Sequence, residues 1–192
     1  MKKVDIQSRR RVFDDVFKID EAELRFEQYN GEMSPPVRRL SFERGDSVAA
    51  VVWCRDTDDL LFTEQFRFPT LTKGPGWLLE VMAGVIDGDE TPEAAVRREI
   101  EEELGYRIDR LEPIATFFVS PGGSSERIFL YFVDTTGASR VSAGGGVAAE
   151  HEDIHVVTMP RAAARQRLAE GSFTDAKTII GLQWFFSRGE RP

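Results

Sequence analysis

The sequence predicts a mixed fold, an α+β or α/β sandwich, made of one compact domain with a small accessory region. Three observations predict it. Short apolar runs typical of β-strands recur along the chain, a few segments with helical periodicity interrupt them, and 192 residues suffice to bury a sizeable core. Hydrophobic residues make up 41% and charged residues 30% of the chain, which is the ordinary balance of a globular protein.

The first region, residues 1–45, carries scattered apolar positions and is predicted to form short strands. The dipeptide Asn30-Gly31 readily adopts the positive φ of a hairpin turn, and residues 37–43 are a further candidate strand. So few strands are not stable alone. We therefore expect this region to pack on the rest of the chain or on a second copy of it.

The second region, residues 46–192, is expected to form the main domain. Its apolar runs predict strands at residues 48–54, 60–66, 77–82, 114–119, 127–133 and 154–159. Its helical patterns cover residues 94–104, 160–169 and 175–186. Loop signals cover residues 83–88 and the glycine-rich, flexible stretch 142–149.

The first of these helices has well-defined ends. Thr91 is a good N-cap, and Pro92 suits the first helical position because its missing N–H has no intrahelical partner to lose. Gly105 suits the left-handed conformation that ends many helices. We therefore predict that the helix runs to Leu104.

Three carboxylates share one stripe of this helix. At about 3.6 residues per turn, Glu99 and Glu103 stack one above the other and Glu102 lies beside them. Like charges at this spacing destabilise a helix by about 0.2–0.5 kcal/mol, and a bound Mg²⁺ would turn that repulsion into coordination. The alternative is a solvated charged face with Arg97 and Arg98 as partners. A neighbouring apolar stripe, expected to face the core, contains Val96, Ile100 and Leu104.

Charge and composition exclude several classes of protein. A formal net charge of -8 leaves no excess of basic residues to neutralise nucleic-acid phosphates, so no nucleic-acid partner is expected. No run approaches the roughly 18 apolar residues of a membrane span. Arginines rather than an apolar stretch follow the first residues, so we expect no signal peptide and a cytoplasmic location. Cys54, the single cysteine, is expected to be a buried thiol.

The surroundings of the carboxylates match a known motif. This Nudix box has fixed residues at set spacings, and the chain fills them with Gly84, Glu90, Arg98-Glu99-Ile100, Glu102-Glu103, Gly105 and Tyr106. Glu101 occupies a free position, and Tyr106 is the only loose fit. The chain therefore resembles the Nudix hydrolase superfamily.

The resemblance implies an α/β/α sandwich with a loop–helix–loop metal site. In it, Glu99 and Glu103 would bind Mg²⁺ (or Mn²⁺), with Glu102 and the backbone carbonyl of Ala83 contributing. It also implies that Arg98 orients the carboxylates and that Glu90 braces the loop. The metal would bridge diphosphate oxygens and lower the pKa of an attacking water.

Further segments resemble bacterial ADP-ribose pyrophosphatases. They lie at residues 30–34, 37–39, 42–45, 64–67, 77–80, 83–84, 120–127 and 182–184. This likeness implies a small N-terminal antiparallel sheet that crosses to the partner in a homodimer. Leu40 departs from it, since an acidic residue often follows the two arginines. Residues 143–147 and 175–178 also resemble GDP-mannose hydrolases, and UDP-glucose is a third candidate substrate.

The same likeness assigns roles outside the box. Arg39 and Arg67 would contact phosphate or ribose, although surface ion pairs are an equal alternative for a single arginine. Glu80 and Glu126 would place or support the metal ligands, and Glu126 is also a candidate for binding substrate. Glu150 is the expected general base in a closing loop, and Glu152 is the second candidate or a further metal ligand.

We therefore expect an enzyme that hydrolyses the diphosphate of ADP-ribose to AMP and ribose 5-phosphate. The alternatives are a GDP-mannose or other nucleotide-sugar pyrophosphatase, and a non-catalytic module that senses a nucleotide. Intact carboxylates argue against the sensor, since a retired site has no need for charges that repel each other.

Overall fold

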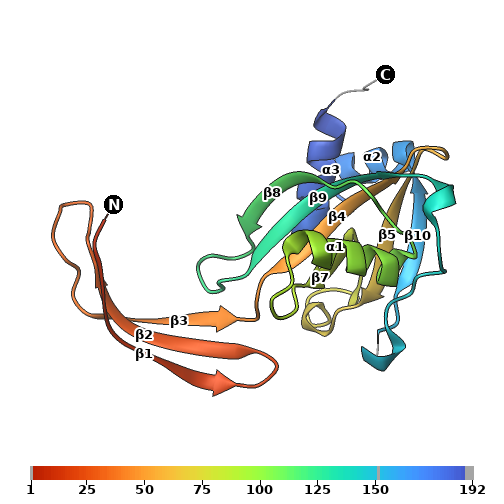
Figure 1. The fold of residues 1–192 in the computed structure, drawn as a ribbon. Helices are drawn as coiled ribbons and strands as arrows, with labels where there is room; N and C mark the ends of the chain where they lie inside the picture. The colour runs from red at the N-terminus through yellow and green to blue at the C-terminus, as the bar shows by residue number, and fades with distance from the viewer. Residues whose placement is uncertain (1, 151, 189–192) are drawn as a thin grey trace. The chain divides into compact units, whose positions relative to one another are not determined.

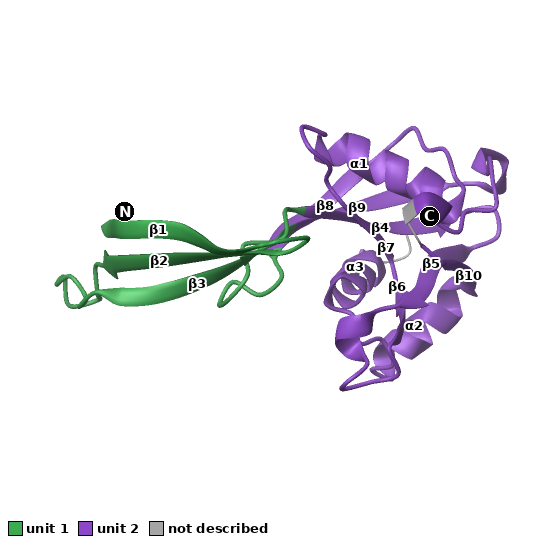
Figure 2. Ribbon diagram, turned by 90° about the horizontal axis from the view of Figure 1, so that it is seen from below, with its two compact units in different colours: residues 1–46, 118–127 green, residues 47–117, 128–192 purple. Residues whose placement is uncertain are grey.

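The computed structural model describes residues 2–150 and 152–188, with the side chain of Glu150 excepted. The chain forms two compact units (Figures 1 and 2). The smaller contains residues 1–46 and 118–127, and the larger contains residues 47–117 and 128–192. Residues 118–127, which sequence analysis placed in the main domain, thus cluster with the N-terminal region. We call these units unit 1 and unit 2.

Unit 1 is built on a three-stranded antiparallel sheet in the order β1-β2-β3. Its strands are β1 (Val4–Asp14), β2 (Lys18–Phe26) and β3 (Val37–Glu43). β1 and β2 are long strands rather than the short ones predicted, and they join at a turn of residues 15–17 that sequence analysis did not identify. The predicted turn at Asn30-Gly31 lies between β2 and β3, where Gly31 has a φ of 86°.

The core of unit 2 is a seven-stranded sheet with the main order β10-β5-β4-β9-β8. β6 extends it by pairing with β5, and β7 by pairing with β4. The strands are β4 (Ser47–Cys54), β5 (Asp59–Phe66), β6 (Trp77–Glu80), β7 (Met82–Val85), β8 (Glu112–Phe118), β9 (Arg127–Thr135) and β10 (His155–Pro160).

Helices cover both faces of this sheet (Figure 2). They are α1 (Pro92–Glu99), continued by a π-helical turn η2 (Ile100–Leu104), and α2 (Arg161–Ala169) and α3 (Ala176–Ser187). Alternate residues of β4 serve the two faces, because Val48 packs in the cluster under α1 and Val51 packs in the cluster under α3. The predicted α/β/α sandwich is therefore confirmed.

Local signals set the ends of the first helix as predicted. The Thr91 hydroxyl accepts a hydrogen bond from the N–H of Ala94, and Gly105 ends the helix at a φ of 79°. The last turn, residues 100–104, is π-helical rather than α-helical. The predicted apolar stripe is fully buried at Val96, Ile100 and Leu104, and Cys54 is buried.

The predicted single strand at residues 77–82 is wrong. The chain instead changes neighbours at Val81, so that β6 pairs with β5 and β7 pairs with β4. The N–H of Val81 donates to the Thr178 hydroxyl at 2.9 Å rather than to a neighbouring strand. β7 then occupies residues 82–85, where a loop was predicted.

In the described part of the chain, no helix has the length and apolar character that crossing a membrane requires.

Candidate active site

Arg98, near the end of α1, connects the acidic side chains of the predicted site. Its Nη1 donates to Glu99 at 2.9 Å and to Glu102 at 3.0 Å. Its Nη2 donates to Glu90 at 3.0 Å and to the carbonyl of Val85 at 3.2 Å. One guanidinium therefore ties the helix to the strand and loop that precede it, a geometry that suits the roles expected of Arg98 and Glu90.

Glu99 and Glu103 are buried rather than solvated. Their exposed fractions are 7% and 2%, and burial is the main cause that raises the pKa of Glu99 to about 7 and of Glu103 to about 8. The negative charges of Glu102 and Glu152 raise the pKa of Glu99 further, and those of Glu99 and Glu152 raise the pKa of Glu103 further. By contrast, the Glu101 side chain is 41% exposed and paired with Arg107 at 2.7 Å. The Glu102 side chain is 33% exposed and paired with Arg98, so the alternative of a solvated face fails for Glu99 and Glu103 but not for Glu101 and Glu102.

Close approach of β7 to the helix holds these carboxylates in place. A β-carbon at Gly84 would lie 1.9 Å from the carboxyl carbon of Glu99, so only glycine leaves room for that side chain. A backbone hydrogen bond from Ala83 to Glu103 partly offsets the rise in the pKa of Glu103. Ala83 and Gly84 thus border the acidic stripe, as the Nudix resemblance implies.

The glycine-rich loop packs against the end of the same helix. The N–H groups of Gly145 and Gly146 donate to the carbonyls of Glu103 at 2.9 Å and Glu102 at 3.1 Å. Gly144, Gly145 and Gly146 all have positive φ, and a β-carbon at Gly144 would lie 2.4 Å from the Glu103 carbonyl oxygen. The loop predicted as flexible is thus tied to the helix that carries the carboxylates.

Glu152 follows this loop and lies within the electrostatic reach of the acidic stripe. Its carboxylate accepts a hydrogen bond from the N–H of Val147 at 2.9 Å, and its charge raises the pKa of both Glu99 and Glu103. The backbone of Glu150 belongs to a short turn, residues 148–150, but its side chain lies outside the described residues.

The chemistry of these groups fits a hard divalent cation. Oε2 of Glu103 is buried and has no hydrogen-bond partner among the described residues, which leaves a carboxylate oxygen uncompensated. In that same part of the chain, no three acidic, histidine or cysteine side chains are already arranged as a complete metal site. Glu99 and Glu103 would therefore form the centre of such a site, with Glu102 released from Arg98 to join them.

Arg67, directly after β5, and Glu80, the last residue of β6, form a second cluster of charges. Nε of Arg67 donates to Glu80 at 2.8 Å, and Nζ of Lys177 lies 2.5 Å from the other oxygen of Glu80. Lys177 also contacts Asp175 at 2.9 Å. No local sequence pattern gives Lys177 a role. The stretch Asp175–Thr178 was noted only as a likeness, and its contact with a residue 97 positions earlier has no local signal.

The remaining predicted site residues belong to unit 1. Arg39 is exposed on β3 and its Nη1 donates to the backbone carbonyl of Arg38. Glu126 is mostly buried and lies 3.8 Å from Nε of Arg44. Their participation in the site stays a prediction.

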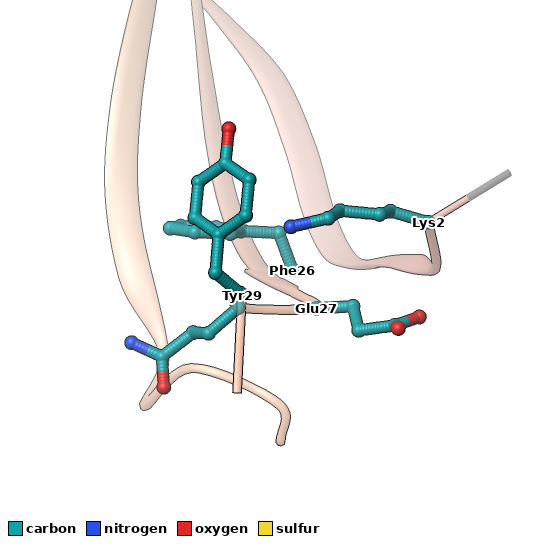
Figure 3. A pocket seen from close by; sticks show the side chains of 5 residues that line it. Lys2, Phe26, Glu27 and Tyr29 are labelled. Carbon is teal, nitrogen blue, oxygen red and sulfur yellow. The ribbon is translucent and has the colours of Figure 1, made fainter. Parts of the chain in front are cut away.

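Unit 1 also contains a pocket of about 310 Å³ (Figure 3). It is lined by Lys2, Phe26, Glu27, Gln28 and Tyr29. The Lys2 ammonium lies 3.3 Å from the centre of the Tyr29 ring, and that ring is otherwise fully exposed. None of the predicted site residues lines this pocket.

Comparison with known proteins finds relatives that match most of this chain. ADP-ribose pyrophosphatase of Escherichia coli K12 is 38% identical over 184 residues, which cover 94% of this chain and 87% of that protein. GDP-mannose pyrophosphatase of Cronobacter sakazakii is 38% identical over 154 residues, 79% of each chain. GDP-mannose pyrophosphatase of Pectobacterium atrosepticum is 33% identical over 188 residues, 97% of this chain and 95% of that protein.

A solved structure shares the fold of this chain, and a known domain family matches its sequence. A crystal structure of an ADP compounds hydrolase superposes with a TM-score of 0.73 at 20% identity, covering 98% of this chain and 97% of that one. This likeness shows the fold. The NUDIX domain family matches residues 44–179, which include the acidic helix and the glycine-rich loop. The chain therefore belongs to the NUDIX domain family, as its sequence motif indicates.

Proposed function

We propose that this protein hydrolyses the diphosphate of ADP-ribose to AMP and ribose 5-phosphate, with Mg²⁺ as its metal and Mn²⁺ as a substitute. The observation that carries this proposal is the buried pair Glu99 and Glu103, whose uncompensated charge a divalent cation would offset. Nudix membership and the relatives named ADP-ribose pyrophosphatase support the substrate class.

The chain would supply positioning, charge and a proton acceptor. Glu99 and Glu103, with Glu102 and the Ala83 carbonyl, would hold the metal, which when bound supplies charge to the diphosphate oxygens and acidifies water. Arg98 would keep the carboxylates in register. Arg67 would donate hydrogen bonds to a phosphate from its terminal nitrogens.

Hydrolysis also needs a group that takes a proton from the attacking water. As water oxygen bonds to one phosphorus, the bridging P–O bond breaks and the second phosphate leaves with the bridging oxygen. Glu150 is the first candidate for the base, and Glu152 is the second or a further metal ligand. The contact of Gly145 with Glu103 supports a base on this loop, because it ties the loop to the metal-binding helix.

ADP-ribose is preferred to GDP-mannose because of coverage. The Escherichia coli and Cronobacter sakazakii relatives share the same 38% identity, but the former matches 94% of the chain and the latter 79%. GDP-mannose remains the second candidate, since the Pectobacterium atrosepticum relative matches 97% of the chain at 33% identity.

We also propose that the protein is a homodimer in which residues 1–45 are exchanged between subunits, with Arg39 and Glu126 contacting substrate. The exposed apolar side chains of unit 1 support this assembly, because every residue of β1 is exposed and a small sheet needs a packed hydrophobic face to be stable. They include Val4, Ile6, Val12, Phe13, Val16 and Phe17. A cytoplasmic location stays a prediction from the sequence.

A substrate panel tests the function. ADP-ribose, GDP-mannose, UDP-glucose and a dinucleoside polyphosphate would be incubated with Mg²⁺, and products would be separated by anion exchange. We expect the highest kcat/KM for ADP-ribose, with AMP and ribose 5-phosphate as products. Turnover of the dinucleoside polyphosphate alone would reject the substrate class. Tight nucleotide binding without any hydrolysis would reject catalysis in favour of a sensor.

Glu150→Gln and Glu152→Gln would separate the two candidate bases, since loss of the base lowers kcat far more than KM.

A further inference from the structure

Lys177 is a buried lysine to which the proposed reaction assigns no role. It lies in the first turn of α3, and only 9% of its side chain is exposed. Burying an ammonium group is costly unless it is paired. Among the described residues it pairs with Glu80, on β6, and with Asp175, the N-cap of α3. Both elements are labelled in Figure 2.

Glu80 is shared between Lys177 and Arg67. Oε1 of Glu80 contacts the lysine and Oε2 accepts from Nε of Arg67, so each carboxylate oxygen has its own cation. The Glu80 side chain is only 4% exposed, whereas that of Arg67 is 36% exposed. Negative and positive side chains therefore alternate from the partly buried Asp175 through Lys177 and Glu80 to the half-exposed Arg67.

This arrangement leaves the terminal nitrogens of Arg67 available. Glu80 accepts from Nε alone, and among the described residues Nη1 and Nη2 of Arg67 have no hydrogen-bond partner. The positive charge of Arg67 also lowers the pKa of Glu103, which indicates that the guanidinium lies near the acidic helix. A guanidinium held at Nε can offer both terminal groups to phosphate oxygens.

The position of Lys177 is itself fixed. Asp175 accepts hydrogen bonds from the N–H and the hydroxyl of Thr178, and this hydroxyl accepts from the N–H of Val81. The start of α3 is thus attached to the residue that directly follows Glu80. Lys177 and Glu80 therefore meet in one geometry rather than by chance approach of two long side chains.

We propose that Lys177 is a positioning residue that keeps Arg67 available to bind a diphosphate. By occupying Oε1 of Glu80, Lys177 limits Arg67 to a single bond with that carboxylate. Without the lysine, Oε1 would accept a second hydrogen bond from Arg67, and the favourable two-pronged pair would withdraw a terminal nitrogen from substrate. The proposal rests on the proposed function only in taking a diphosphate as the ligand of Arg67.

The test measures binding rather than turnover. Methylenediphosphonate, a pyrophosphate analogue that cannot be hydrolysed, is titrated calorimetrically into the Mg²⁺-saturated protein. We expect Lys177→Met to raise the dissociation constant about tenfold, the loss of roughly one charge-assisted hydrogen bond. Lys177→Arg restores both charge and donors, so it is expected to bind as the wild type does. Lys73→Met, an exposed lysine in the loop between β5 and β6, is the control for net charge.

A double-variant cycle shows whether Lys177 acts through Arg67. If it does, Lys177→Met adds nothing to the loss caused by Arg67→Ala, whereas independent effects add. Additive losses, or binding by Lys177→Met equal to that of Lys73→Met, would overturn the proposal, as would a wild type that does not bind the analogue. Lys177→Leu, which likewise offers no donor to Glu80, carries the same test if the methionine variant melts below the assay temperature. If no substrate of the panel is hydrolysed but the losses of Lys177→Met and Arg67→Ala are not additive, the proposed function is rejected and this inference stands.

Discussion

Glu99 and Glu103 are buried together on successive turns of one helix, and Oε2 of Glu103 has no hydrogen-bond partner among the described residues. A buried carboxylate without compensation costs stability, because desolvation penalises its charged form. We expect the same uncompensated charge to bind the cation.

Glu103→Gln is therefore expected to have opposite effects on activity and stability. Loss of a metal ligand removes several kcal/mol of transition-state stabilisation, so kcat/KM falls at least about a hundredfold. At pH 8 and above, where Glu103 is ionised, removal of the buried charge stabilises the metal-free fold by about 1–3 kcal/mol, or roughly 2–10 °C in Tm. Steady-state kinetics in Mg²⁺ and thermal unfolding in EDTA measure the two effects.

Glu101→Gln is the matched control on the same helix. Glu101 is half-exposed and, among the described residues, forms its ion pair with Arg107, so its variant should keep wild-type activity and melting temperature within error. A Glu103→Gln variant that behaves like this control would remove the metal assignment.

The metal-free protein should lose stability as pH rises from about 4.5 to 8. Burial raises the pKa values of Glu99 and Glu103 from 4.5 to about 7 and about 8. Between pH 4.5 and 8 the folded chain therefore binds more protons than the unfolded chain. The free energy of unfolding therefore falls with pH across this window. Carboxyls whose pKa is lowered, such as Glu90 beside Arg98, give up their stabilising contribution only at lower pH.

Denaturant unfolding in EDTA at several pH values checks this dependence. The decline should be shallower in Glu103→Gln and shallower again in excess Mg²⁺, because each removes or neutralises the buried charge. Equal slopes in all three samples would mean that these carboxylates are not the source of the pH dependence.

The sequence predicts those features of this site that depend on neighbouring residues, and it does not predict those that depend on contacts between residues far apart in the chain. The helix ends at Thr91 and Gly105 are predicted because capping depends on neighbouring residues. The break of the strand at Val81 is missed because its N–H binds a hydroxyl 97 residues away. The stripe of Glu99 and Glu103 follows from helical periodicity, but its burial depends on how the sheet packs beneath it.

The glycine-rich loop shows the same limit in another form. Consecutive glycines predict conformational freedom, which favours a flexible loop. In the fold their positive φ values instead let the backbone cap the helix, with Gly145 donating to the carbonyl of Glu103. Composition identifies such a segment but not the surface against which it docks.

Gly84→Ala should weaken metal binding without unfolding the protein. Its β-carbon would lie 1.9 Å from the Glu99 carboxyl carbon, so the flexible end of that side chain must move away from Glu103. Displacement of a metal ligand of this kind typically costs about 10–100-fold in metal affinity. Titration of Mn²⁺ followed by electron paramagnetic resonance measures that affinity directly.

Gly74→Ala provides the comparison for the glycine variant. A β-carbon there would lie 3.6 Å from the nearest atom, which is an ordinary contact, so metal affinity should be unchanged. Equal Mn²⁺ affinity in the two variants would show that Gly84 does not make room for a ligand.

Arg98→Lys should raise the Mg²⁺ concentration needed for activity. A lysine offers one compact ammonium group, and it cannot bond Glu90, Glu99 and Glu102 together as the guanidinium does. We expect kcat/KM at fixed Mg²⁺ to fall about 10–100-fold, with partial recovery at saturating metal. Kinetics over a Mg²⁺ series would show this shift.

Arg97→Lys separates the role of Arg98 from a general loss of helix stability. Arg97 donates to the backbone carbonyls of Ile108 and Asp109 and to none of the predicted ligands. Its lysine variant should therefore melt at a lower temperature yet keep the wild-type Mg²⁺ requirement. A shifted requirement in both variants would point to helix destabilisation instead.

The most direct test is a crystal structure with Mn²⁺ and a non-hydrolysable ADP-ribose analogue, with data collected at a wavelength where manganese scatters anomalously. We predict an anomalous peak bonded to the carboxylates of Glu99 and Glu103 and to an oxygen of the diphosphate. An analogue bound elsewhere, with no peak at these two carboxylates, would contradict the metal site and the function proposed for it.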